Sequence, residues 1–176
     1  MKFINLNYLV LLIYLISTNF SYSIDRPEIR NLVIHKNKKK IENAEFINLN
    51  GKKLNINNYS ENSMIINFWA TWCAPCRKEM PSLDKLKLLN EFSNVDIIPI
   101  NIGGDTKEKS IKFFQDVNIR NLEIFSGSGQ EFSEKFKIRG LPTTILIDKN
   151  GYEFARIVGY IDFENKSFLD WLNNNL

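Results

Sequence analysis

The most informative segment of the chain reads Asn67-Phe68-Trp69-Ala70-Thr71-Trp72-Cys73-Ala74-Pro75-Cys76 and holds its only two cysteines. With no third cysteine, the pair has no other partner for a disulfide and cannot complete a four-thiolate zinc site. A bridge that closes so short a loop removes little entropy from the unfolded chain, so it is a weak structural staple. The pair is therefore predicted to be reactive and to undergo dithiol–disulfide exchange.

The surroundings of the pair assign a different role to each cysteine. Met64–Trp69 is an apolar run of strand length, and apolar residues recur at helical spacing from Cys76 to Phe92, with Pro81 predicted to kink that helix. Cys73 is then at the helix N-terminus, where free backbone N–H groups and the helix dipole favour a thiolate. We expect Cys73 to be the nucleophile and Cys76, one turn further on, to be the resolving thiol.

The remaining pattern predicts an α/β sandwich. Alternating strand and helix signals, with a closing hairpin and a last helix, indicate one mixed sheet flanked by helices. The predicted elements are an edge strand at 32–34, a hairpin at 44–56 around Asn50-Gly51, a strand at 95–102, a helix from Thr106 to Val117, a short strand or link at 122–125, a short helix at 131–136, a hairpin at 143–158 and a helix at 165–174.

The first residues read as an export segment. Lys2 precedes a continuous apolar run, Tyr8–Ile16, that is too short to span a bilayer and fits a signal peptide with a cleavage site before Ile24. Retention of this segment as an N-terminal membrane anchor is the alternative. The chain is accordingly divided into residues 1–23 (signal peptide or anchor), 24–43 (a polar leading segment) and 44–176 (one globular domain).

The formal net charge of +3 gives no electrostatic footprint for nucleic acid. One basic run, Lys36 and Lys38–Lys40, is predicted to be solvated in a polar connection, with a role at a membrane surface or acidic partner as the alternative. His35, the only histidine, is far from the cysteines in sequence, so neither a metal site nor a cofactor is expected.

Several motifs together resemble the exported TlpA/ResA/CcmG-like branch of the thioredoxin-fold proteins. The resemblance covers residues 44 to 174 and combines the export segment with the motifs Asn50-Gly51-Lys52, Phe68-Trp69-Ala70-Thr71-Trp72-Cys73, Arg77-Lys78-Glu79-Met80-Pro81, Gly140-Leu141-Pro142-Thr143-Thr144 and Ile147-Asp148-Lys149-Asn150-Gly151. It implies a thioredoxin-like sandwich with an N-terminal β-hairpin extension, and a redox-active disulfide between Cys73 and Cys76.

The resemblance also implies a substrate-binding surface. It places a cis peptide bond before Pro142, facing the cysteines, which leaves the Leu141 backbone to pair with an incoming peptide. A trans proline that starts a strand is the structural alternative. Trp72 is expected to shield one side of Cys73 and to form part of the docking surface.

The chain departs from ordinary thioredoxins at one position. Those proteins carry a buried Asp on the strand before the active site, and the matching residue here is Asn67, which cannot accept a proton from Cys76. Glu79, three residues after Cys76, matches the acidic residue of the exported branch, and partial burial would suit it to take that proton. A solvated helical Glu is the rival interpretation.

These observations predict a periplasmic thiol–disulfide oxidoreductase that acts as a reductant. The resemblance implies protein disulfide substrates, either apocytochrome c or copper-site proteins, and a membrane thiol reductant that regenerates the dithiol. A disulfide-donating oxidant of the same fold is the first alternative, and a reduction potential near −120 mV rather than about −270 mV would favour it. A metal chaperone that uses the two thiolates is a more distant alternative. A monomer is expected, because the docking surface is small and transient.

Overall fold

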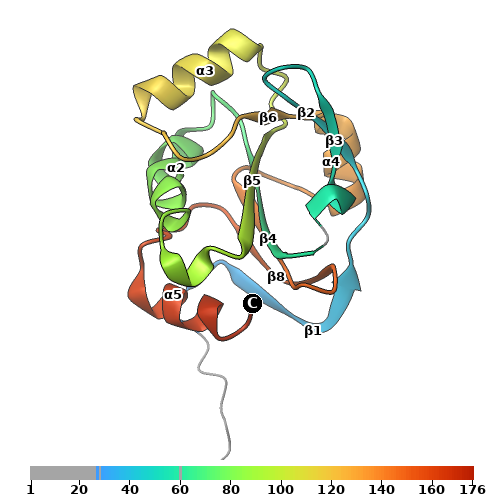
Figure 1. The fold of residues 1–176 in the computed structure, drawn as a ribbon, viewed down its shortest axis with the longest axis vertical. Helices are drawn as coiled ribbons and strands as arrows, with labels where there is room; N and C mark the ends of the chain where they lie inside the picture. Colours follow the sequence, from blue (N-terminus) through green and yellow to red (C-terminus); the bar gives the residue numbers. More distant parts are fainter. Residues whose placement is uncertain (1–26, 28, 60) are drawn as a thin grey trace, which may run out of the picture.

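The computed structural model describes residue 27 and residues 29–59 and 61–176, which form a mixed β-sheet covered by helices on both faces (Figure 1). The strand order within these residues is β1-β8-β7-β4-β5-β6-β2-β3. The strands are β1 (Leu32–Lys40), β2 (Glu45–Asn48), β3 (Lys53–Asn55), β4 (Ser63–Trp69), β5 (Val95–Asn101), β6 (Phe125–Ser126), β7 (Thr143–Ile147) and β8 (Tyr152–Val158). The helices are α2 (Ala74–Leu86), α3 (Lys107–Asp116), α4 (Gly129–Phe136) and α5 (Lys166–Asn173), with short 3₁₀ turns η1 (Ile56–Tyr59) and η2 (Asn90–Phe92).

Strand β4 is the centre of the sheet, and all of its residues are buried. It runs parallel to β5 and antiparallel to β7. One face of β4 contributes Ile65 and Trp69 to a core shared with α2, α3 and α5, whereas the other contributes Ile66 and Phe68 to a core shared with α4. Because both faces of the strand are covered, its sequence is apolar without strict alternation.

The fold confirms the predicted sandwich and its N-terminal hairpin. Strands β2 and β3 pair antiparallel across the Asn50-Gly51 turn, where Gly51 has a positive φ of 74° that glycine adopts without strain. Strands β7 and β8 form the second predicted hairpin. The predicted cap of α3 is also present, because the Thr106 hydroxyl accepts a hydrogen bond from the Lys109 N–H at 3.3 Å.

The helix after the cysteines is shorter than predicted. Its apolar periodicity runs to Phe92, but α2 ends at Leu86. Leu88 is 63% exposed, and the 3₁₀ turn η2 returns Phe92 to the core. The periodicity therefore spans two separate elements that pack against one core. Of the short strand or extended link predicted at 122–125, residues 122–124 form the link, and the strand β6 begins at Phe125.

The basic run does not lie in a polar connection. Strand β1 extends through Lys40 and pairs with β8, so the first strand of the sheet lies within the predicted leading segment 24–43. Lys38 Nζ contacts Asp148 Oδ2 at 2.7 Å, and Lys40 Nζ donates to the Asn150 carbonyl at 2.9 Å. Two of the lysines thus bind the turn between β7 and β8.

The predicted signal peptide, residues 1–23, lies outside the described residues. Within the part of the chain that the structure describes, no helix combines the length and the apolar character needed to cross a membrane.

Candidate active site

The two cysteines form a disulfide where β4 leads into α2. Cys73 is the N-cap residue of α2 with extended backbone angles, and its Sγ accepts a hydrogen bond from the Cys76 N–H at 3.2 Å. Pro75 occupies the first turn, where the missing N–H has no partner to lose. The predicted placement of Cys73 at the helix N-terminus is confirmed. Cys73 keeps 4% exposure and Cys76 none, so Cys73 is the more accessible residue of the pair.

The peptide bond between Leu141 and Pro142 is cis, as the resemblance implied. The next residue, Thr143, pairs with Phe68 near the end of β4. Because the cysteines follow the same end of β4, the Leu141–Pro142 bond and the disulfide lie at one edge of the sheet. Leu141 is half-buried and contacts both cores, and Pro142 is buried.

Glu79 is a fully buried carboxyl group on α2. Its Oε1 accepts a hydrogen bond from Asn67 Nδ2 at 2.7 Å, and its Oε2 accepts one from the Ile161 N–H at 3.1 Å. Burial raises the pKa of Glu79 to about 7, although the two hydrogen bonds favour the ionised form and oppose the rise. The solvated Glu that the sequence left open as a rival interpretation is therefore wrong.

Trp72 is the most exposed of the large apolar side chains near the disulfide, with 68% of its surface accessible. Its indole Nε1 donates to the Gly103 carbonyl at 3.4 Å, in the loop between β5 and α3. Tryptophan is enriched at protein interfaces, because its ring offers a large apolar area and its N–H a hydrogen-bond donor.

The loop that carries Trp72 is held by Asp105, which the sequence analysis missed. Asp105 Oδ2 accepts the Thr71 N–H at 2.8 Å, and its Oδ1 accepts the Thr71 hydroxyl at 2.6 Å. Burial opposes ionisation of Asp105, but the hydrogen bonds from Thr71 and Asn101 hold its pKa below the ordinary value. Asp105 follows β5, the parallel neighbour of β4, so β4 and β5 end at the same edge of the sheet. This position after β5 was the signal in the sequence that could have placed Asp105 near the cysteines.

Gly103, in the loop between β5 and α3, allows that loop to lie close to the segment that leads to Cys73. A Cβ on Gly103 would lie 2.4 Å from the Ala70 Cβ, within the segment that leads to Cys73. A larger residue would therefore displace one of the two loops.

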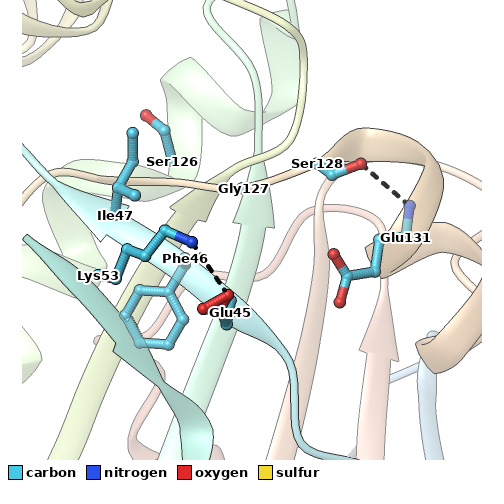
Figure 2. A pocket seen from close by; sticks show the side chains of 8 residues that line it. All are labelled: Glu45, Phe46, Ile47, Lys53, Ser126, Gly127, Ser128 and Glu131. Carbon is cyan, nitrogen blue, oxygen red and sulfur yellow. Dashed lines mark hydrogen bonds and ion pairs between the residues drawn. The ribbon is translucent and has the colours of Figure 1, made fainter. Parts of the chain in front are cut away.

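The structure also contains a pocket of about 300 Å³ that does not include the cysteines or Glu79. It lies between the β2–β3 hairpin and the start of α4, over Phe46 and Ile47 (Figure 2). Lys53 Nζ and Glu45 Oε2 are 3.5 Å apart there, and Ser128 caps α4 by accepting the Glu131 N–H. This pocket is separate from the redox centre.

No group of three or more His, Cys, Asp and Glu side chains within the described residues is arranged to hold a metal ion. His35 instead lies on β1, where its Nε2 is 2.5 Å from Glu153 Oε1. Glu153 also binds Arg156 through both carboxylate oxygens, at 2.6 and 2.8 Å. The histidine is thus part of a partly buried hydrogen-bonded network with Glu153 and Arg156 that joins β1 to β8.

The fold and the site together define the protein as a thiol–disulfide oxidoreductase. The disulfide lies at the N-cap of a helix, and the cis-proline lies at the same edge of the thioredoxin-like sheet. The chain belongs to the Redoxin family, whose family profile matches residues 36–168. Within that family it is a thioredoxin-fold enzyme of the ResA/CcmG type.

Individual relatives agree with this assignment. The chain is 31% identical to the thiol-disulfide oxidoreductase ResA of Bacillus thuringiensis (strain Al Hakam) over 121 residues. These residues make up 69% of this chain and 69% of the relative. Among solved structures, a DsbF homologue from Corynebacterium diphtheriae superposes with a TM-score of 0.68 at 19% identity, covering 86% of this chain and 96% of the other. A secreted thiol-disulfide isomerase from Corynebacterium glutamicum gives a TM-score of 0.66 at 19% identity, with 85% and 96% covered. These two similarities establish the fold.

Proposed function

We propose that this enzyme is exported to the periplasm and reduces disulfides of other exported proteins, with Cys73 as nucleophile and Cys76 as resolving thiol. The observation that supports the assignment of roles is the position of Cys73 as the N-cap of α2, where helix N–H groups stabilise a thiolate. Cys76 is fully buried, which suits a thiol that reacts only within the protein.

The proposed reaction transfers two electrons. The Cys73 thiolate attacks one sulfur of a substrate disulfide, whose S–S bond breaks and whose second sulfur leaves as a thiolate that takes a proton from solvent. Cys76 then loses its proton and attacks the Cys73 sulfur of the mixed disulfide. The first substrate sulfur leaves and is protonated in turn, so the substrate is reduced and the Cys73–Cys76 disulfide is formed. A membrane thiol reductant restores the dithiol.

Substrate docking is assigned to Trp72, Leu141 and Pro142. Trp72 supplies exposed apolar surface, and the backbone beside the cis bond is suited to pair with an extended substrate segment. The resemblance to the TlpA/ResA/CcmG-like branch favours apocytochrome c or copper-site proteins as substrates. The same resemblance, together with the apolar run at Tyr8–Ile16, supports export, followed by cleavage after residue 23 or retention as an anchor. We propose that the enzyme works as a monomer.

A mixed-disulfide trap tests the nucleophile and identifies the substrate. A Cys76→Ala variant, expressed in the native host, is expected to remain covalently attached to its substrate through Cys73, because no thiol is left to resolve the intermediate. The attached proteins are released with reductant and identified by mass spectrometry, with the Cys73→Ala, Cys76→Ala double variant as the control. An empty trap from exported, folded protein would contradict the exchange mechanism.

We further assign Glu79 the role of accepting the Cys76 proton during resolution. Only ionised Glu79 can take this proton, and burial sets its pKa at about 7. The rate of resolution is therefore expected to rise about tenfold between pH 6 and pH 8 in the native enzyme, as Glu79 loses its proton. In Glu79→Gln that rise is expected to disappear, which stopped-flow measurement of substrate release will show.

The exposed helical carboxylate Glu108 offers a matched control, because Glu108→Gln removes the same charge from a group in contact with solvent. It is expected to leave the pH profile of resolution unchanged. Identical kinetics for Glu79→Gln and the native enzyme from pH 5 to 8 would remove Glu79 from the mechanism.

A further inference from the structure

Trp72 is a large apolar side chain that lies outside the core, although burial of apolar surface is favourable. The other two tryptophans, Trp69 and Trp171, are buried. Within the described residues, the indole of Trp72 has a single hydrogen bond, the long one of 3.4 Å to the Gly103 carbonyl. So weak a contact does not fix the ring, and the position of Trp72 beside Cys73 is therefore set mainly by the backbone that carries it.

The backbone directly before Trp72 is fixed by both oxygens of the Asp105 carboxylate. Oδ2 accepts the Thr71 N–H at 2.8 Å, and Oδ1 accepts the Thr71 hydroxyl at 2.6 Å. Hydrogen bonds to an ionised carboxylate are stronger than those between neutral groups, and two of them on one residue fix its orientation as well as its place. Because Thr71 directly precedes Trp72, the same contacts aim the tryptophan.

Asp105 is itself held in place by the end of β5 and by α3. The side-chain amide of Asn101, the last residue of β5, donates to Asp105 Oδ2 at 3.0 Å and to Ser110 Oγ on α3 at 3.1 Å. The Asn101 Oδ1 accepts the Gly103 N–H at 2.8 Å. Asn101 and Ser110 are both buried. The carboxylate that binds Thr71 is thus attached to the rigid part of the fold and does not belong to a free loop.

Gly103 brings this loop into contact with the turn that carries the tryptophan. A Cβ at position 103 would lie 2.4 Å from the Ala70 Cβ and 3.0 Å from Trp72 Nε1. The loop therefore packs against both the residue before Thr71 and the residue after it. Hydrogen bonds and close packing act on the same three residues, 70–72.

We propose that Asp105 is a positioning residue for protein substrates, which holds Trp72 out of the core beside Cys73. It acts through the geometry of its hydrogen bonds to Thr71 and not through its charge. Affinity for a protein disulfide, which docks on Trp72, then depends on Asp105, whereas the exchange step at Cys73 does not. This inference rests on the proposed function for the docking role of Trp72.

Two substitutions at Asp105 separate geometry from charge. Asp105→Ala removes the contacts to Thr71, so the KM for insulin is expected to rise about tenfold, with kcat within about twofold of the native value. Asp105→Asn keeps these contacts, because its amide oxygen accepts the Thr71 N–H and its amide nitrogen donates to the Thr71 hydroxyl, which also accepts. Its KM is expected to stay within about twofold of the native value. Glu108→Gln, which removes an exposed charge nearby, is the control and is expected to change neither parameter.

A double-mutant cycle tests whether Asp105 acts through Trp72. In the Trp72→Ala background, Asp105→Ala is expected to raise the KM for insulin no further, because the side chain that it positions is gone. An equal rise in both backgrounds would overturn the proposal, as would a native KM in Asp105→Ala or a loss confined to kcat. A KM that rises as much in Asp105→Asn as in Asp105→Ala would show that the charge, and not the geometry, is what matters.

The positioning of Trp72 is also measurable without turnover. In the full chain in its disulfide form, ¹⁵N relaxation of the Trp72 backbone amide is expected to give an order parameter near about 0.85 in the native protein and in Asp105→Asn, and below about 0.6 in Asp105→Ala. A Trp72 amide that stays rigid in Asp105→Ala would overturn the proposal. Failure of the proposed function is distinct, since a native KM in Trp72→Ala would remove Trp72 from docking while the relaxation still reports whether Asp105 holds it.

A milder pair of variants at Thr71 serves if Asp105→Ala does not fold. Thr71→Val removes the hydroxyl contact and keeps the backbone N–H contact, so the KM for insulin is expected to rise about threefold. Thr71→Ser keeps both contacts and is expected to retain the native KM. Equal KM values for Thr71→Val and Thr71→Ser would contradict the role of the Asp105–Thr71 contact.

Discussion

A Cys73→Ser variant is expected to reduce insulin at least about a thousandfold more slowly than the native enzyme. A serine hydroxyl has almost no anionic form at neutral pH, even at a helix N-terminus, whereas the Cys73 thiol there gains a stabilised thiolate. The measurement is the turbidity of insulin chains released in the presence of dithiothreitol, with the uncatalysed reaction subtracted.

The matched control is Cys76→Ser, which removes the same disulfide and keeps the proposed nucleophile. It is expected to react with a small chromogenic disulfide in a single turnover and to stop as the mixed species, whereas Cys73→Ser does not react. The free energy of unfolding of both variants is expected to lie within about 1 kcal/mol of that of the reduced native enzyme. None of these forms has a crosslink, and Ser is close to Cys in size. A reactive Cys73→Ser together with an inert Cys76→Ser would reverse the proposed roles.

An Asp84→Ala variant is expected to lower the free energy of unfolding by about 3 kcal/mol. Asp84 lies buried on α2 and accepts hydrogen bonds from the segment that joins α3 to β6. The donors are the backbone N–H groups of Arg120 at 3.3 Å, Asn121 at 2.8 Å and Leu122 at 3.0 Å, and the Asn121 side-chain amide at 2.7 Å. Removal of the carboxylate leaves the buried Leu122 N–H without its acceptor and releases the segment. Urea denaturation measures the change.

Asp116 provides the comparison, because its more exposed carboxylate contacts Lys112 at 3.0 Å and Arg77 at 3.9 Å. Exposed ion pairs contribute little, so Asp116→Ala is expected to change the free energy of unfolding by about 0.5 kcal/mol or less. Equal stability losses in Asp84→Ala and Asp116→Ala would show that the Asp84 hydrogen bonds do not hold the segment.

The features that were predictable from sequence depend on residues close together in the chain. The N-cap position of Cys73 follows from an apolar strand that ends four residues earlier and from a helical pattern that begins beside it. The β2–β3 turn follows from Asn50-Gly51. The cis bond before Pro142 came from the resemblance of a short motif, since spacing alone does not distinguish cis from trans.

Other features were missed because they join distant parts of the chain. The end of α2 at Leu86 was obscured because Phe92 packs into the same core from a different element. The lysines at 36 and 38–40 are exposed, as predicted, but they lie on strand β1 and not in a polar connection, because the partners of Lys38 and Lys40 at Asp148 and Asn150 are more than a hundred residues away. Asp105 and Asp84 are ordinary acidic residues in sequence, and only the fold brings backbone N–H groups to them.

The sequence by itself predicted the chemistry of this protein, because the Cys73–Cys76 pair at a strand–helix junction favours a reactive thiolate through local geometry, and the motif around Pro142 makes that signal specific. The tertiary structure decided the state of Glu79. The sequence allowed a solvated carboxylate or a buried one, and the choice depends on whether β4, β7 and the segment at Ile161 cover that face of α2. They do cover it, and the loss of water around the carboxyl is what raises its pKa to about 7.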